Sequence, residues 1–414
     1  MYEAIIALLV VSFLFLIVNA KLLKLPPSIG LLILGMVLSL TMFGFKNFIP
    51  SVYNAIPHFM EEINFNYFLM DMILPFLLFA GAIHINVSEL EKQKIPVFVF
   101  AIFSTLISTL LVGYLSYHLF GALGIDLPLI YCMLFGALIS PTDPIAVLSI
   151  FKNYKVKRSL SMKIEGESLF NDGIGIVIFI TISGMISQDG GTIDAMQTLM
   201  LFLREAVGGI AFGLVTGWLA LFIMKRVVDP KYAVYVTFLI ATFSYALANH
   251  LEVSGALAMV AAGILTGNWL HTKAKPEIRK ITDTSWEIID EIFNAMLFVL
   301  MGFSIIELDF EVAGIAAAVT AILIVLFSRL VSVSVPFALI GVNKGKTRFI
   351  PGIKEITILT WSGLRGGLGF ALALSLIKVP GGEFIVYITY VVASFSIIVQ
   401  GLTIGKVVTK LKMG

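Results

Sequence analysis

This sequence has little charge, a single cysteine and no long polar stretch. Only 13% of its 414 residues are Asp, Glu, Lys or Arg, whereas 59% are hydrophobic, and the mean hydropathy is +1.00. Such a composition excludes a soluble globular protein, in which about a quarter of the residues are charged. The lack of polar stretches also excludes a separate soluble domain. We therefore expect a single membrane domain over residues 1–414, and the net charge of +2 gives no indication of a nucleic-acid partner.

The scarcity of soft metal ligands excludes two further kinds of site. Cys132 is the only cysteine, so the chain can form neither an internal disulfide nor a thiolate metal cluster. The five histidines are scattered without the paired spacing of zinc ligands. We therefore expect no cofactor, and we expect Cys132 to be a small buried residue.

Apolar runs long enough to span a bilayer, about 20 residues each, recur along the whole chain. The first begins near Glu3 with no basic segment before it, so we expect a membrane span there and not a cleaved signal peptide. We predict an all-α membrane protein with thirteen transmembrane helices. They cover residues 3–22, 27–43, 65–85, 95–120, 129–151, 166–187, 199–224, 232–250, 253–270, 285–305, 312–340, 353–377 and 383–405.

The distribution of basic residues predicts the orientation of these spans. If the N-terminus is outside, 23 of the 28 Lys and Arg residues fall in inner loops. Only Lys46 and Lys378 fall outside, and Arg204, Arg329 and Arg365 lie within spans. Because cytoplasmic loops are enriched in Lys and Arg, we expect a multi-pass protein of the cell membrane with its N-terminus outside and its C-terminus in the cytoplasm.

The fifth span is interrupted by residues that a helix tolerates poorly. Residues 137–145 read Ala-Leu-Ile-Ser-Pro-Thr-Asp-Pro-Ile, and the two prolines leave the carbonyl oxygens of Ala137 and Ser140 without helical partners. Unwound backbone at membrane depth is tolerated where it lines a cavity or an ion site. Asp143 costs at least about 2.5 kcal/mol to insert, so we expect it to belong to such a site. The alternative is that Asp143 only caps the following helix.

An internal comparison relates this interruption to a second one. The segment Leu74–Ile83 resembles Met296–Ile305 at an offset of 222 residues. The same offset carries Asp143 onto Arg365, in the glycine-rich run 363–369 of the twelfth span. The matching spans are seven helices apart, and since seven is odd, the two halves run in opposite directions. Inverted repeats with two broken helices crossing near the midplane are typical of ion-coupled secondary transporters.

A polar stripe in the sixth span completes the predicted site. Ser168, Asn171 and Asp172 share one helix face. If this face lies against the interruption of the fifth span, the side chains offer only oxygen ligands, which hard cations prefer. These ligands are the carboxylates of Asp143 and Asp172 and the hydroxyls of Thr142 and Ser168.

Two opposite charges lie beside this stripe. Glu167 precedes Asn171 by one helical turn, and Arg365 comes from the opposite repeat. We expect Glu167 and Arg365 to pair, because a lone buried charge is costly. The pair could serve packing alone or also gating, and the sequence leaves both open.

At these motifs the sequence resembles the monovalent cation/proton antiporter-1 family, which includes prokaryotic sodium/proton antiporters and animal sodium/hydrogen exchangers. The resemblance covers all thirteen spans and rests on residues 140–144, 167–172, 298–302 and 363–367. It implies the sodium/proton antiporter fold and a homodimer. It also implies a dimerisation region and a six-helix core, here formed by about residues 65–187 and 285–405.

The resemblance implies a secondary transporter, not an enzyme, which exchanges Na⁺ or Li⁺ for H⁺ by alternating access. An Asn-Asp pair, here Asn171 and Asp172, resembles the branch that exchanges one cation for one proton without net charge. The chain departs from the family at Ala80, where many members carry an acidic residue, so one possible ligand is missing. The implied cation ligands are Thr142, Asp143, Ser168 and Asp172, supported by Asn171, Glu167 and Arg365.

Three alternative functions remain. A K⁺/H⁺ antiporter would have the same fold. A passive cation channel would need rings of ligands, whereas inverted repeats favour alternating access. An intramembrane aspartyl protease would also need two membrane aspartates, but the sequence contains no Gly-x-Gly-Asp motif.

Overall fold

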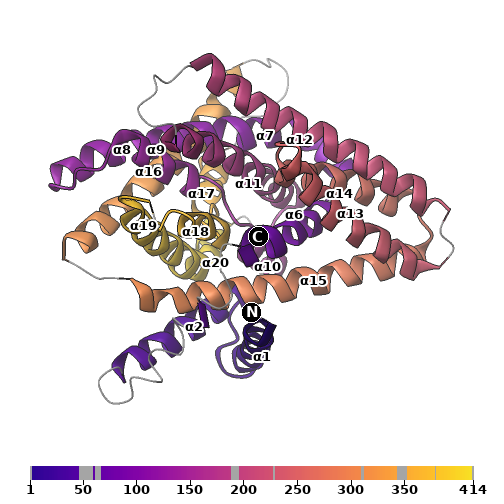
Figure 1. The fold of residues 1–414 in the computed structure, drawn as a ribbon, viewed down its shortest axis with the longest axis horizontal. Coiled ribbons are helices and arrows are strands. Elements are labelled where there is room, and N and C mark those ends of the chain that lie inside the picture. Colours follow the sequence, from indigo (N-terminus) through magenta and orange to yellow (C-terminus); the bar gives the residue numbers. More distant parts are fainter. Residues whose placement is uncertain are drawn as a thin grey trace.

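The protein is built from helices that pack side by side. The computed structural model describes residues 2–45, 59–60, 67–187, 195–226, 229–308, 312–342, 352–377 and 379–412, and no strand occurs among them. In Figure 1 the long helix α15 runs across the molecule below α6, α10 and α11, with α1 and α2 on its other side. The helices are α1 (Tyr2–Val18), α2 (Pro27–Gly44), α6 (Leu74–Ile83), α7 (Val87–Val99), α8 (Thr105–Ala122), α9 (Leu129–Ile139), α10 (Ile145–Asn153), α11 (Arg158–Ser187), α12 (Ala195–Met224), α13 (Pro230–His250), α14 (Gly255–Thr272), α15 (Pro276–Phe303), α16 (Val312–Val342), α17 (Ile353–Trp361), α18 (Gly367–Leu374), α19 (Gly382–Phe395) and α20 (Gly401–Leu411).

Every predicted span coincides with a helix or with a pair of helices. Among the described residues, nine helical stretches are long and apolar enough to cross a membrane. The other four predicted spans correspond to the segment Phe68–Ile83, to α14, and to the helix pairs α9–α10 and α17–α18. The all-α membrane fold is confirmed, whereas the number of crossings stays a prediction. Some residues used in the topology argument lie outside the described residues, namely Lys46, Lys344, Lys346, Arg348 and Lys378.

Large apolar side chains point outward from several helices. Phe13 on α1 is 63% exposed, Trp218 on α12 is 63% exposed and Leu323 on α16 is 62% exposed. Large apolar side chains exposed on many helices are unfavourable in water and are well solvated by lipid chains. The chain is therefore a multi-pass membrane protein.

The two predicted helix interruptions exist, and they contact each other. Residues 140–144 separate α9 from α10, and residues 362–366 separate α17 from α18. The Asp143 N–H donates to the Leu364 carbonyl oxygen at 2.7 Å, which joins the two interruptions. Gly366 permits this approach, because a Cβ atom there would lie 2.6 Å from the Cβ of Asp143. The predicted crossing of two broken helices is thus confirmed.

A close contact also joins α12 to α14 at one end of the molecule (Figure 1). A Cβ atom on Gly213 would lie 2.3 Å from the Ala258 carbonyl oxygen, and one on Gly209 would lie 2.5 Å from the Ser254 carbonyl oxygen. Small residues at such positions let two membrane helices pack backbone to backbone.

Candidate cation-binding site

The polar stripe of α11 packs against the interruption between α9 and α10. Asn171 Nδ2 donates to Thr142 Oγ1 at 3.0 Å, and the Thr142 N–H donates to Asn171 Oδ1 at 3.3 Å. The Ser168 hydroxyl donates to the Thr142 carbonyl oxygen. Thr142, Ser168 and Asn171 are all buried. These hydrogen bonds replace the helical partners that the interruption removes, so the predicted juxtaposition of the two segments is present.

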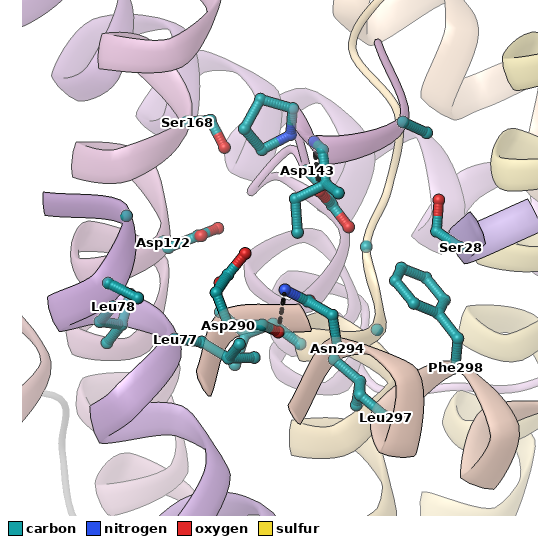
Figure 2. A pocket seen from close by; sticks show the side chains of 18 of the residues that line it. Ser28, Leu77, Leu78, Asp143, Ser168, Asp172, Asp290, Asn294, Leu297 and Phe298 are labelled. Atoms are coloured by element: carbon teal, nitrogen blue, oxygen red, sulfur yellow. Dashed lines mark hydrogen bonds between the residues drawn. The ribbon is translucent and has the colours of Figure 1, made fainter. Parts of the chain in front are cut away.

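Asp143 and Asp172 line one cavity of about 540 Å³, together with Ser168 (Figure 2). Asp143 Oδ1 accepts the N–H of Ile145, the first residue of α10, at 2.8 Å. Asp143 therefore has the capping contact considered above, and it also faces the cavity. In the described part of the chain, neither carboxylate forms an ion pair. A cation bound by these aspartates, or a proton on one of them, would relieve the repulsion between their charges.

Arg365 lies in the second interruption and contacts the first. Its Nη1 donates to the carbonyl oxygen of Ser140 and, at 3.3 Å, to that of Pro141. Its backbone N–H donates to Ser396 Oγ at 3.0 Å, and the residue is 2% exposed. Ser140 carries one of the carbonyls that the prolines are expected to free. The guanidinium therefore satisfies unpaired oxygens and lies against the partial negative charge at the C-terminal end of α9.

The prediction that Glu167 pairs with Arg365 is wrong. Glu167 pairs with Arg329 of α16, which donates through both terminal nitrogens, and the Nη2–Oε2 distance is 3.0 Å. The two side chains are only 2% and 5% exposed, respectively. Arg329 Nη2 also donates to the Leu359 carbonyl oxygen at 3.2 Å. Arg365 is hydrogen-bonded to carbonyls of the first interruption. Gly363 leaves room for Arg329, because a Cβ atom on Gly363 would lie 2.4 Å from Arg329 Nε. The sequence places both arginines in spans and has no signal for which one reaches Glu167.

Helix α15 contributes two polar residues that the sequence interpretation missed. Asp290 and Asn294 line the same cavity as the aspartate pair (Figure 2). The first half of α15 carries many charged residues, so Asp290 does not stand out among them. Its spacing of one helical turn from Asn294 is the signal that could have identified it. Ala80, where many family members have an acidic side chain, also lines this cavity.

The side chains around the two aspartates offer carboxylate, hydroxyl and amide oxygens. Hard monovalent cations such as Na⁺ and Li⁺ are bound by oxygen ligands of this kind. The geometry is therefore suited to a cation that has lost part of its water shell and to a proton that replaces it.

The sequence is similar to those of curated antiporters over its whole length. It is 40% identical over 417 residues to the Na(+)/H(+) antiporter NhaP of Pseudomonas aeruginosa. The aligned region covers 100% of this chain and 98% of that protein. It is 35% identical over 396 residues to the Na(+)/H(+) antiporter NhaH of Halobacillus aidingensis, with 95% of this chain and 93% of that protein covered.

The fold is shared with a solved structure, that of the sodium proton antiporter MjNhaP1 from Methanocaldococcus jannaschii at pH 8. The TM-score is 0.77 at 22% sequence identity, with 100% of this chain and 99% of that chain covered. The family described as “Sodium/hydrogen exchanger, transmembrane” matches residues 8–410. The resemblance inferred from the motifs is confirmed, and this chain belongs to the sodium/hydrogen exchanger family.

Proposed function

We propose that this protein is a secondary transporter that exchanges Na⁺ for H⁺. The observation that carries the proposal is the shared cavity of Asp143 and Asp172, in which neither carboxylate has a basic partner among the described residues. The relatives that are 40% and 35% identical are named Na(+)/H(+) antiporters, which favours Na⁺ over K⁺ as the exchanged cation.

Coupling follows from competition at one carboxylate. Asp172 can offer a full negative charge to a cation only when it is deprotonated, so a bound cation and a bound proton exclude each other there. The Asp172 carboxyl group thus alternates between the two ions. Asp143, Thr142 and Ser168 supply the remaining cation ligands in this proposal.

The neighbouring groups support this site without exchanging ions themselves. Asn171 is neutral and hydrogen-bonds to Thr142 through both amide atoms. Arg365 satisfies the carbonyls of the first interruption, and Glu167 is paired with Arg329. One exchanging carboxylate and a neutral Asn171 favour one cation for one proton, an exchange without net charge.

The cavity lies close to the helix ends that the charge asymmetry predicts to be cytoplasmic. Its lining includes His84, directly after α6, and the exposed Lys152, near the end of α10. Glu287, which is also exposed, lines the cavity from the first half of α15. These positions support an inward-facing cavity in a chain with its N-terminus outside and its C-terminus in the cytoplasm of the cell. Alternating access would then open the same site to the other side.

The proposal includes the assembly that the family resemblance implies. The chain would form a homodimer, with residues 65–187 and 285–405 as the transporting core and the remaining helices as the dimerisation region. The crossing of the two interruptions supports this division, because both interruptions lie within the proposed core.

Exchange is tested with purified protein in liposomes that enclose a pH-sensitive dye. Adding Na⁺ outside should make the interior more alkaline, because each entering Na⁺ expels a proton. Asp172→Asn should abolish the response, because an amide neither exchanges a proton nor carries a charge. Clamping the membrane potential with K⁺ and valinomycin should leave the rate unchanged if the stoichiometry is one to one. A passive channel would instead move protons only with an added protonophore, and an equal response to K⁺ would overturn the assignment of Na⁺.

A further inference from the structure

The side of α15 that faces the cavity carries a row of polar residues that the aspartate pair does not explain. Glu287, Asp290, Glu291 and Asn294 lie at positions i, i+3, i+4 and i+7, and all four line the cavity. Seven residues of α-helix rise by about 10 Å. The row therefore extends about 10 Å along the cavity wall.

The members of this row differ in exposure. Glu287 and Glu291 are exposed, Asp290 is half-buried, and Asn294 is only 8% exposed. A carboxylate within a membrane-spanning helix is costly unless it meets water or an opposite charge. Within the described parts of the chain, Asp290 forms no ion pair. His84, which lines the same cavity, acts on this carboxylate electrostatically without pairing with it, and the carboxylate is open to a cation or to water in the cavity.

Asn294 presents a second oxygen one helical turn from Asp290. Its Nδ2 donates to the Asp290 carbonyl oxygen at 2.9 Å. Its Oδ1 has no hydrogen-bond donor among the residues that the structure describes, although the side chain is more than nine-tenths buried. The oxygen atom itself is not fully enclosed by the protein, so in the cavity it is open to water or to a cation. Asp290 and Asn294 thus present a carboxylate and an amide to the cavity from the same helix face (Figure 2).

We propose that Asp290 and the Asn294 amide oxygen form a second cation position, at which a partly hydrated Na⁺ is held before it moves to Asp143 and Asp172. The cation would exchange some of its water for these two oxygens first and for the ligands of the aspartate pair afterwards. This position raises the occupancy of the transport site and takes no part in proton exchange. The inference rests on the proposed sodium/proton exchange.

Asp290→Asn tests this position in proteoliposomes. The sodium KM should rise about tenfold, because a unit charge that acts over about 10 Å at an effective dielectric constant of about 20 changes affinity by about that factor. The maximal rate should change less than twofold, because Asp290 exchanges no proton. Glu277→Gln is the matched control. It makes the same carboxylate-to-amide change on α15 at an exposed residue outside the cavity, and its KM should stay within twofold of wild type.

A binding measurement separates this inference from the exchange activity. Na⁺ should raise the melting temperature of purified Asp172→Asn protein, which does not exchange, and this rise should disappear when Asp290→Asn is added. Asn294→Leu keeps the side-chain volume and removes the amide oxygen, so it should also raise the sodium KM. This variant is used in place of Asp290→Asn if Asp290→Asn does not fold.

Equal KM values for Asp290→Asn and Glu277→Gln in an otherwise active protein would overturn the second position and leave the exchange intact. The second position would also be overturned if Na⁺ raised the melting temperature of the Asp172→Asn/Asp290→Asn double variant as much as that of Asp172→Asn. Failure of the wild type to exchange would instead overturn the proposed function, and the melting temperatures would still test cation binding at Asp290.

Discussion

The pairing of Glu167 with Arg329 gives a quantitative prediction about stability. Both side chains are almost completely buried, and two N–H···O hydrogen bonds join them. Arg329→Met leaves the Glu167 carboxylate buried without an opposite charge, which should cost about 3–5 kcal/mol of the free energy of unfolding. Adding Glu167→Gln removes that lone charge. The double variant should therefore be at least about 2 kcal/mol more stable than the sum of the two single losses implies.

The two single variants and the double variant form a double-mutant cycle, and the same cycle with Arg365 in place of Arg329 is the control. Arg365 donates to the carbonyls of Ser140 and Pro141 and not to Glu167, so the coupling between Arg365→Met and Glu167→Gln should stay below about 1 kcal/mol. Unfolding by denaturant in detergent micelles, followed by the fluorescence of the four tryptophans, measures all the variants. Strict additivity in the Arg329 cycle, or a larger coupling in the Arg365 cycle, would refute the pairing.

The exchange site, the topology and the packing of α12 each give a further measurement. In proteoliposomes the sodium KM should rise about tenfold for each pH unit on the acidic side of the optimum, because the deprotonated fraction of Asp172 falls tenfold; a KM independent of pH would show that protons use another group. A cysteine introduced at the exposed position Lys157 should react with impermeant reagents only from the cytoplasmic side, and one at the exposed position Asp126 only from the outer side. Labelling of both from the same side would contradict the thirteen-span topology. Gly213→Leu should lower the melting temperature, because its Cβ would lie 2.3 Å from a carbonyl oxygen of α14, whereas Gly184→Leu, with nothing within 4 Å, should not.

The helix interruptions could be predicted because they depend on local chemistry. Two prolines remove specific backbone donors, and this happens whatever surrounds them. The packing of Asn171 against Thr142 could also be predicted, because a polar stripe in an apolar span must lie against other polar groups. The partner of Glu167 could not be predicted. Three arginines lie in spans, and which of them reaches Glu167 depends on the room that Gly363 leaves for Arg329, which is a property of the packed structure.

The starts of several helices also differ from the apolar runs, for a physical reason. Helix α7 begins at Val87 and α15 at Pro276, well before the predicted spans at 95 and 285. Asn86 accepts the Glu89 N–H at 3.1 Å, so a side-chain cap and not hydropathy sets the start of α7. These polar first turns extend the helices beyond the apolar runs. Asp290 lies in α15 close to the start of its apolar run, which explains why hydropathy did not reveal its place in the cavity.

The bond that joins the two interruptions uses only main-chain atoms, the N–H of residue 143 and the carbonyl oxygen of residue 364. Every residue except proline can donate it, and every residue can accept it. Evolution can therefore replace Asp143 or Leu364 and keep the contact between the two halves of the chain. Lineages can change the ion that is recognised, or lose transport altogether, without first losing the architecture. The side chains that recognise the ion and the backbone contact that joins the two halves can therefore change independently in evolution.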